Sequence, residues 1–174
     1  GKIWLEMSTT DADEVKRLGA MVIAKGGEAV DCPVSGGCHR ADTGNISIFA
    51  GCERATFERV LPILTILGRR VLHTGPIGSA STLKVMTNYL ATANLLTVCE
   101  AMVTMKAAGV DLATTFEAIR ISSGNSFVHE TEGALILNGS YDIAFNIDLA
   151  LKDLGFALGF GKEFGVPLEL ASMT

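Results

Sequence analysis

The sequence predicts an α/β architecture over residues 1–74 that is followed by an all-α architecture over residues 75–174. Two observations carry this prediction. Short apolar runs of strand length alternate with helical runs up to residue 73, which is typical of a parallel sheet with crossover helices. After that residue the longer apolar runs have helical spacing, and no further strand is predicted.

Apolar spacing sets the expected elements of the α/β part. We expect strands over residues 2–6, 28–31, 45–50 and 69–73, and helices over residues 11–25 and 53–67. Asp11 can cap the first helix, and Gly68 can end the second. Residues 32–37 and 39–44 are expected to be loops. Because a strand starts almost at the first residue, we expect the chain to enter its α/β domain part of the way through.

The all-α part opens with a long helix that we expect to run from about Gly75 to Lys106. Its residues are apolar nearly all round, which predicts a buried helix that joins two domains. Further helices are expected over residues 111–121, 127–132 and 146–164. A long apolar helix in an incomplete helical domain would leave hydrophobic surface exposed, so we expect a homo-oligomer.

Composition excludes several classes of function. The net charge is −5 and no basic cluster is present, which argues against nucleic-acid binding. Charged and amide residues interrupt the long helix, which argues against a membrane span. The four cysteines lack the spacing of a zinc site, so no metal is expected. We expect a cytoplasmic protein, and the mitochondrial matrix stays open.

Lys84 and Asn88 stand four residues apart on the long helix and therefore share one face. Two interpretations of Lys84 are open at this point. It can be a lysine that carries its ammonium group out to water, or a functional amine placed in an apolar setting.

Residues Ser35, Gly36 and Gly37 follow the strand that is expected to end at Asp31. Parallel sheets bind ligands at the carboxyl ends of their strands, and glycines let backbone N–H groups approach a small anion. The segment is therefore a candidate anion site, although an ordinary turn is also compatible with it. It is not a hydrolase nucleophile elbow, because Pro33 stands where that motif has glycine.

Three motifs together resemble the β-hydroxyacid dehydrogenases, which include 3-hydroxyisobutyrate dehydrogenase and tartronate semialdehyde reductases. They are Cys32-Pro-Val-Ser-Gly-Gly37, the stretch from Gly75 to Asn88, and Lys152-Asp153. The resemblance covers essentially the whole chain. It implies the C-terminal part of a Rossmann domain, then a long interdomain helix and an incomplete helical domain.

The resemblance also implies roles for individual residues. Lys84 and Asn88 match the catalytic pair; Ser35, Gly36 and Gly37 match the loop that binds the substrate carboxylate; and Thr9, Lys152 and Asp153 match positions at the cofactor. Three positions depart from the family pattern, namely Glu6, Ala80 and Tyr89, which stand where Asp, Gly and Asn are usual.

The activity implied is hydride transfer between a nicotinamide cofactor and a small β-hydroxyacid of the 3-hydroxyisobutyrate or tartronate semialdehyde type. Lys84 would be the general acid/base, with its pKa lowered by burial. NAD and NADP both stay open, because the residue that selects between them would precede Gly1. The alternative is a catalytically incomplete dehydrogenase fold that acts in oligomerisation or binding.

Overall fold

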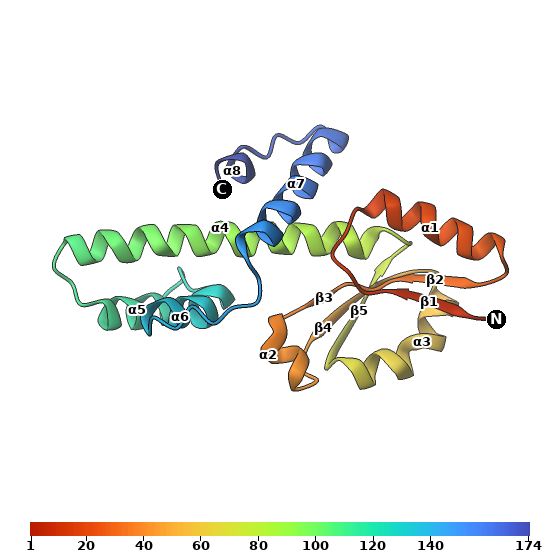
Figure 1. The fold of residues 1–174 in the computed structure, drawn as a ribbon, viewed down its shortest axis with the longest axis horizontal. Coiled ribbons are helices and arrows are strands. Elements are labelled where there is room, and N and C mark those ends of the chain that lie inside the picture. Colours follow the sequence, from red (N-terminus) through yellow and green to blue (C-terminus); the bar gives the residue numbers. More distant parts are fainter.

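The computed structural model describes residues 1–174, apart from the side chain of His39. The α/β part contains three helices and a sheet of five short strands (Figure 1). In chain order its elements are β1 (Ile3–Glu6), α1 (Ala12–Ala24), β2 (Glu28–Asp31), β3 (Val34–Ser35), α2 (Gly37–Asp42), β4 (Ser47–Gly51), α3 (Arg54–Leu67) and β5 (Arg70–Gly75).

The sheet is mixed. β1 is parallel to β2 and β4 is parallel to β5, whereas β4 runs antiparallel to both β2 and β3. The parallel pairs are those that a long helix connects, α1 in one case and α3 in the other. Only residues 36–46 connect β3 to β4, and a connection of this length suits antiparallel neighbours better than a parallel crossover.

Helices cover both faces of the sheet. α1 lies on one face and α3 on the other (Figure 1). α3 contributes Phe57, Val60 and Leu64 to the larger hydrophobic core, where they meet residues of β2 and β4 such as Val30 and Ile48. This core fixes the carboxyl ends of the strands, from which the loops that matter for function emerge.

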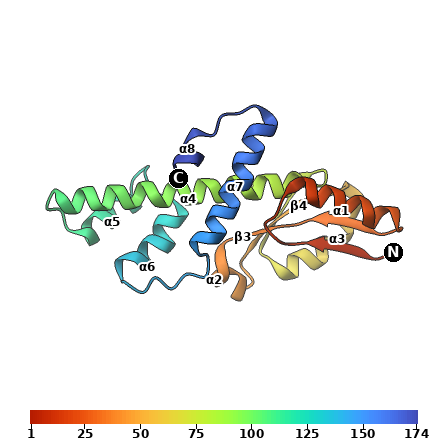
Figure 2. The same ribbon diagram turned by 45° about the horizontal axis from the view of Figure 1, so that its top comes forward.

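The helical part is built on one long helix, α4 (Ser79–Ala107), which leaves the sheet and extends well beyond it (Figures 1 and 2). The remaining elements are α5 (Leu112–Arg120), the π-helix η1 (His129–Gly133), α6 (Ala134–Leu137), α7 (Ile147–Phe164) and α8 (Glu169–Met173). α7 crosses α4, and α5 and η1 also contact it. A second core joins Ala12 of α1 to Val85 of α4 and to Ala157 and Phe160 of α7.

The α/β plus all-α fold class is confirmed, and four local expectations are wrong. Val34 and Ser35 form a strand against β4, and the loop expected at 39–44 is largely replaced by the short helix α2. β5 continues to Gly75, so α4 begins at Ser79. α4 is buried only in part, since Val103 in its far half is 68% exposed. Within the described residues, no helix has the length and apolar character that a membrane span requires.

Candidate active site

Lys84 lies on α4 and is buried, with 7% of its surface exposed. It therefore does not reach out to water, and the first of the two interpretations of this residue is wrong. Its Nζ donates a hydrogen bond to Oδ1 of Asn88 at 2.7 Å. The spacing of four residues brings the two side chains together on one face of the helix.

Asn88 connects Lys84 to the other helix of the site. Its Nδ2 donates to Oδ2 of Asp153 on α7 at 2.6 Å. The orientation of the Asn88 amide follows from its neighbours, because an ammonium group only donates and a carboxylate only accepts hydrogen bonds. Asp153 is 2% exposed, so this contact is shielded from water where α7 crosses α4.

Lys152 extends the same series of hydrogen bonds to the α/β part. Its Nζ donates to Oδ1 of Asp153 at 2.6 Å and to the backbone carbonyl of Thr9 at 2.9 Å. Thr9 lies in the segment between β1 and α1. The five residues Lys84, Asn88, Asp153, Lys152 and Thr9 thus form one continuous network across α4, α7 and the sheet edge.

Burial lowers the pKa of Lys84 to about 8, because water no longer solvates the ammonium form. The negative charge of Asp153 opposes this shift, and the positive charge of Lys152 adds to it. An amine with such a pKa exchanges its proton near neutral pH, which suits a general acid or base.

Ser35, Gly36 and Gly37 lie where β3 passes into α2. They are not part of the hydrogen-bonded network around Lys84 among the described side chains. Gly36 and Gly37 have φ angles of 133° and 75°, a region that favours glycine because other side chains are strained there. Such a backbone can turn successive N–H groups toward one anion.

The three positions that depart from the family pattern lie around this network. Glu6 ends β1, and its Oε1 accepts a hydrogen bond from the backbone N–H of Ser8 at 2.9 Å. Ala80 is fully buried in the first turn of α4, and Tyr89 packs against the second core. None of these three residues takes part in the hydrogen bonds that join Lys84 to Thr9.

The sequence-based prediction missed Asp31, which is fully buried at the end of β2. Its carboxylate accepts hydrogen bonds from the backbone N–H groups of Gly78 and Ser81, at 3.0 and 2.8 Å, and from the Ser81 hydroxyl at 2.6 Å. It therefore caps the N-terminus of the helix that carries Lys84. The signal in the sequence was a carboxylate at the end of an apolar strand, directly before the predicted anion loop.

The described residues outside this network do not form a metal centre. Among them, no group of three histidine, cysteine, aspartate or glutamate side chains is arranged to hold a metal ion.

Comparisons with known proteins show which families the two parts of the chain match. Residues 78–174 match the family described as "NAD-binding of NADP-dependent 3-hydroxyisobutyrate dehydrogenase". Residues 1–75 match the family described as "NAD binding domain of 6-phosphogluconate dehydrogenase".

Two curated relatives align with nearly the whole chain. The 2-(hydroxymethyl)glutarate dehydrogenase of Eubacterium barkeri is 34% identical over 100% of this chain and 58% of its own length. The 2-hydroxy-3-oxopropionate reductase of Escherichia coli K12 is 33% identical over 97% of this chain and 58% of its own length. The chain thus spans somewhat less than three fifths of these relatives.

A solved structure shares the fold. The 3-hydroxyisobutyrate dehydrogenase of Salmonella typhimurium superposes with a TM-score of 0.89 at 28% identity, over 98% of this chain and 60% of that one. The match to the first of the two families covers more than half of the chain. This chain therefore belongs to the 3-hydroxyisobutyrate dehydrogenase family of β-hydroxyacid dehydrogenases.

Proposed function

We propose that the protein containing this chain moves a hydride between NAD or NADP and a small β-hydroxyacid of the 3-hydroxyisobutyrate or tartronate semialdehyde type. The observation that carries the proposal is the buried Lys84, whose Nζ lies 2.7 Å from Oδ1 of Asn88. The names of the relatives support the substrate class, since one is a 2-(hydroxymethyl)glutarate dehydrogenase and another a 2-hydroxy-3-oxopropionate reductase.

The residues near Thr9 fit the nicotinamide end of such a cofactor. Thr9 is half-buried beyond the carboxyl end of β1, and its backbone carbonyl holds the Lys152 ammonium group at 2.9 Å. Together they offer hydrogen-bond donors and acceptors of the kind that a carboxamide requires. We propose that Thr9 and Lys152 hold this end of the cofactor and that Asp153 orients Lys152. The bound cofactor would accept or return the hydride.

Lys84 is the proposed general acid/base. In the oxidative direction its neutral amine takes the proton of the substrate hydroxyl, while the hydride leaves the carbon atom that carries this hydroxyl. In the reductive direction its ammonium form returns that proton. Asn88 orients the amine through its Oδ1, and Asp153 holds the amide in the matching orientation.

Backbone N–H groups of Ser35, Gly36 and Gly37 are the proposed anchor of the substrate carboxylate. Their support is the glycine-only backbone of Gly36 and Gly37 at the end of β3. An anchor in this loop would leave the hydroxyl end of a short acid free to reach an amine on α4.

Replacing Lys84 tests the proposal. In the longest natural chain that contains these residues, Lys84→Met should lower kcat/KM for the hydroxyacid by at least about 100-fold, the scale of a general acid–base contribution. Lys106→Met, which removes an exposed lysine from the last turn of the same helix, should leave it unchanged. In the unmodified enzyme, the rate of oxidation should rise as the pH rises through about 8, because the neutral amine is the base. A Lys84→Met variant with more than a tenth of the original activity would refute the assignment.

The alternative is a dehydrogenase fold that has lost its chemistry and acts by binding. Calorimetric titration with NAD⁺ and with NADP⁺ separates the two possibilities. Binding of either nucleotide supports the enzyme, and binding of neither supports the alternative. For either possibility we propose a homo-oligomer in the cytoplasm or the mitochondrial matrix.

A further inference from the structure

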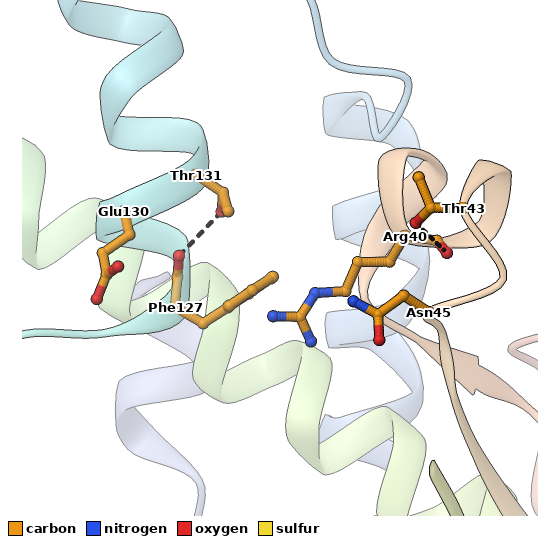
Figure 3. Close-up of a pocket in the computed structure, with 6 residues that line it drawn as sticks. All are labelled: Arg40, Thr43, Asn45, Phe127, Glu130 and Thr131. Carbon is orange, nitrogen blue, oxygen red and sulfur yellow. Dashed lines mark hydrogen bonds between the residues drawn. The ribbon is translucent and has the colours of Figure 1, made fainter. Parts of the chain in front are cut away.

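A cavity of about 680 Å³ opens between the α/β part and the helical part, and its lining does not include the five residues of the Lys84 network. Figure 3 shows the side chains around it. Arg40, Thr43 and Asn45 come from α2 and the segment that follows it, whereas Phe127, Glu130 and Thr131 come from η1 and the residues before it. The cavity therefore lies where both parts of the chain contribute side chains, and α4 passes below it (Figure 3).

Arg40 connects this cavity to the proposed carboxylate loop. It stands three residues after Gly37 on α2, about one helical turn away. Its aliphatic stem covers Gly36, since a Cβ atom added to Gly36 would lie 2.8 Å from Cδ of Arg40. The loop that would hold one carboxylate and the guanidinium group of Arg40 are thus neighbours.

The guanidinium group is held in place by an aromatic ring and has no acidic partner. Its Cζ lies 4.3 Å from the centroid of the Phe127 ring. The ring attracts the cation through its π electrons and supplies no negative charge that would neutralise it. Among the ion pairs between described residues, none includes Arg40, although the residue is half-buried.

One acidic side chain, Glu130, borders the same cavity. Its carboxylate points away from the guanidinium group in Figure 3, and its Oε1 accepts a hydrogen bond from Nδ2 of Asn125 at 2.6 Å. The other polar groups that line the cavity, those of Thr43, Asn45 and Thr131, are uncharged. Among the described side chains of this lining, Arg40 is therefore the only cation, and it faces a space that both parts of the chain border.

We propose that Arg40 determines specificity by binding a second carboxylate of the substrate, so that the preferred substrate is a β-hydroxyacid with two carboxylates. One carboxylate would bind at residues 35–37 and the other at Arg40, separated by a few carbon atoms. The planar fork of Arg40 matches a carboxylate with two parallel hydrogen bonds. This inference rests on the proposed function, because it assigns the substrate class to the same site.

Binding of unreactive acids tests the inference without requiring turnover. Glutarate has two carboxylates. Butyrate is one carbon atom shorter and has one carboxylate. By titration calorimetry on the longest natural chain, glutarate should bind at least about tenfold more tightly than butyrate, the scale of a hydrogen bond between charged groups. Arg40→Gln should abolish that preference. Arg40→Lys should retain part of it, since the charge stays and the fork is lost.

Kinetics provide the second measurement, with 2-(hydroxymethyl)glutarate compared to 3-hydroxyisobutyrate. Arg40→Gln should lower kcat/KM for the dicarboxylate by about 10- to 100-fold and change that for the monocarboxylate by less than about threefold. Arg54→Gln removes an exposed arginine of α3 and should change neither.

Two outcomes overturn the inference: equal affinity for glutarate and butyrate in the unmodified protein, or a preference that survives in Arg40→Gln. Failure of the proposed function looks different. In that case the unmodified protein oxidises neither hydroxyacid with either nucleotide, and the comparison of glutarate with butyrate still decides the role of Arg40.

Discussion

The ammonium group of Lys84 is buried at a site where most helices of this composition would carry an apolar side chain. Burial lowers its pKa from 10.5 to about 8, which means that folding disfavours its charged form. A shift of one pKa unit corresponds to about 1.4 kcal/mol. The residue therefore opposes folding at neutral pH, which is common where a group is kept for catalysis.

Lys84→Met should consequently stabilise the protein at pH 7, by about 2 kcal/mol after the lost hydrogen bond to Asn88 is subtracted. Above its unfolded pKa, a lysine with a lowered folded pKa is neutral in both states and costs no stability. The cost appears as the pH falls and is complete below the folded pKa. The gain should therefore shrink between pH 8 and pH 10.5. Denaturant unfolding at pH 7 and at pH 10.5 measures it. If the variant and the unmodified protein differed equally in free energy of unfolding at both pH values, a buried charge at this position would be contradicted.

The same variant is then expected to be more stable and nearly inactive. This combination separates a catalytic role from a structural one, because a residue kept for packing loses stability when it is replaced. The contact between Lys84 and Asn88 could be predicted from the sequence, because their spacing places both side chains on one face of the helix. The contact between Asn88 and Asp153 could not be predicted in this way, because those residues are 65 positions apart and meet only where α4 and α7 cross.

At the scale of elements, the position of α4 depends on a carboxylate that belongs to another element. Asp31 of β2 accepts the N–H groups of Gly78 and Ser81, which have no partner within the helix itself. Burial raises the pKa of Asp31, and the hydrogen bonds from Ser81 and Gly78 only oppose this shift. Burial thus disfavours the charge of Asp31, while its two oxygens accept the three hydrogen bonds from Gly78 and Ser81.

The loss in the free energy of unfolding on replacing Asp31 should therefore depend on the hydrogen bonds that the new side chain can form. Asp31→Ala leaves buried N–H groups unsatisfied and should lower the free energy of unfolding by about 3 kcal/mol. Asp31→Asn can accept both N–H groups with its oxygen and donate to the Ser81 hydroxyl with its nitrogen, so it should cost less than about 1 kcal/mol. Asp11→Ala, the cap of α1, should cost about 1 kcal/mol. Urea unfolding compares the three variants, and equal losses for Ala and Asn at position 31 would contradict this account.

The elements that the sequence did not predict are those whose form depends on neighbours. α2 is a short helix without an apolar stripe, and it begins directly after Gly36, whose φ angle of 133° favours glycine. β3 has two residues and exists because Val34 pairs with Ile48. By contrast, η1 overlaps the helix predicted near residues 127–132, and His129 in it is fully buried with its Nε2 2.9 Å from the carbonyl oxygen of Phe116. Long periodic helices such as α3 and α7 were predicted because their apolar spacing is local information.

At the scale of the whole molecule, three polar or cation–π contacts add to the second core in joining the two parts of the chain. Asp31 holds the start of α4, Thr9 holds Lys152, and Arg40 lies on Phe127. Each contact pairs a residue of the α/β part with a residue of the helical part that follows it in the chain. The domain boundary between residues 74 and 75 stays a prediction. A site assembled from residues on both sides of this boundary would respond to any movement of one part against the other.

The surface of the helical part predicts the state of assembly. Large apolar side chains are exposed along the far half of α4 and on α7 and α8, among them Leu96, Val103, Leu151 and Met173. Where such side chains adjoin one another, the apolar surface commonly marks an interface. We therefore expect association, with α4 at the contact.

Sedimentation equilibrium of the longest natural chain should give at least twice the mass of one chain at micromolar concentration. Val103→Glu, which places a charge on the exposed half of α4, should shift the protein toward the monomer, because an unpaired charge is costly in an apolar interface. Ile66→Glu is the matched control, since Ile66 is 81% exposed on α3 at the far side of the sheet. A monomeric unmodified protein would contradict the expectation. So would equal dissociation by both variants, because the interface would then not involve α4 in particular.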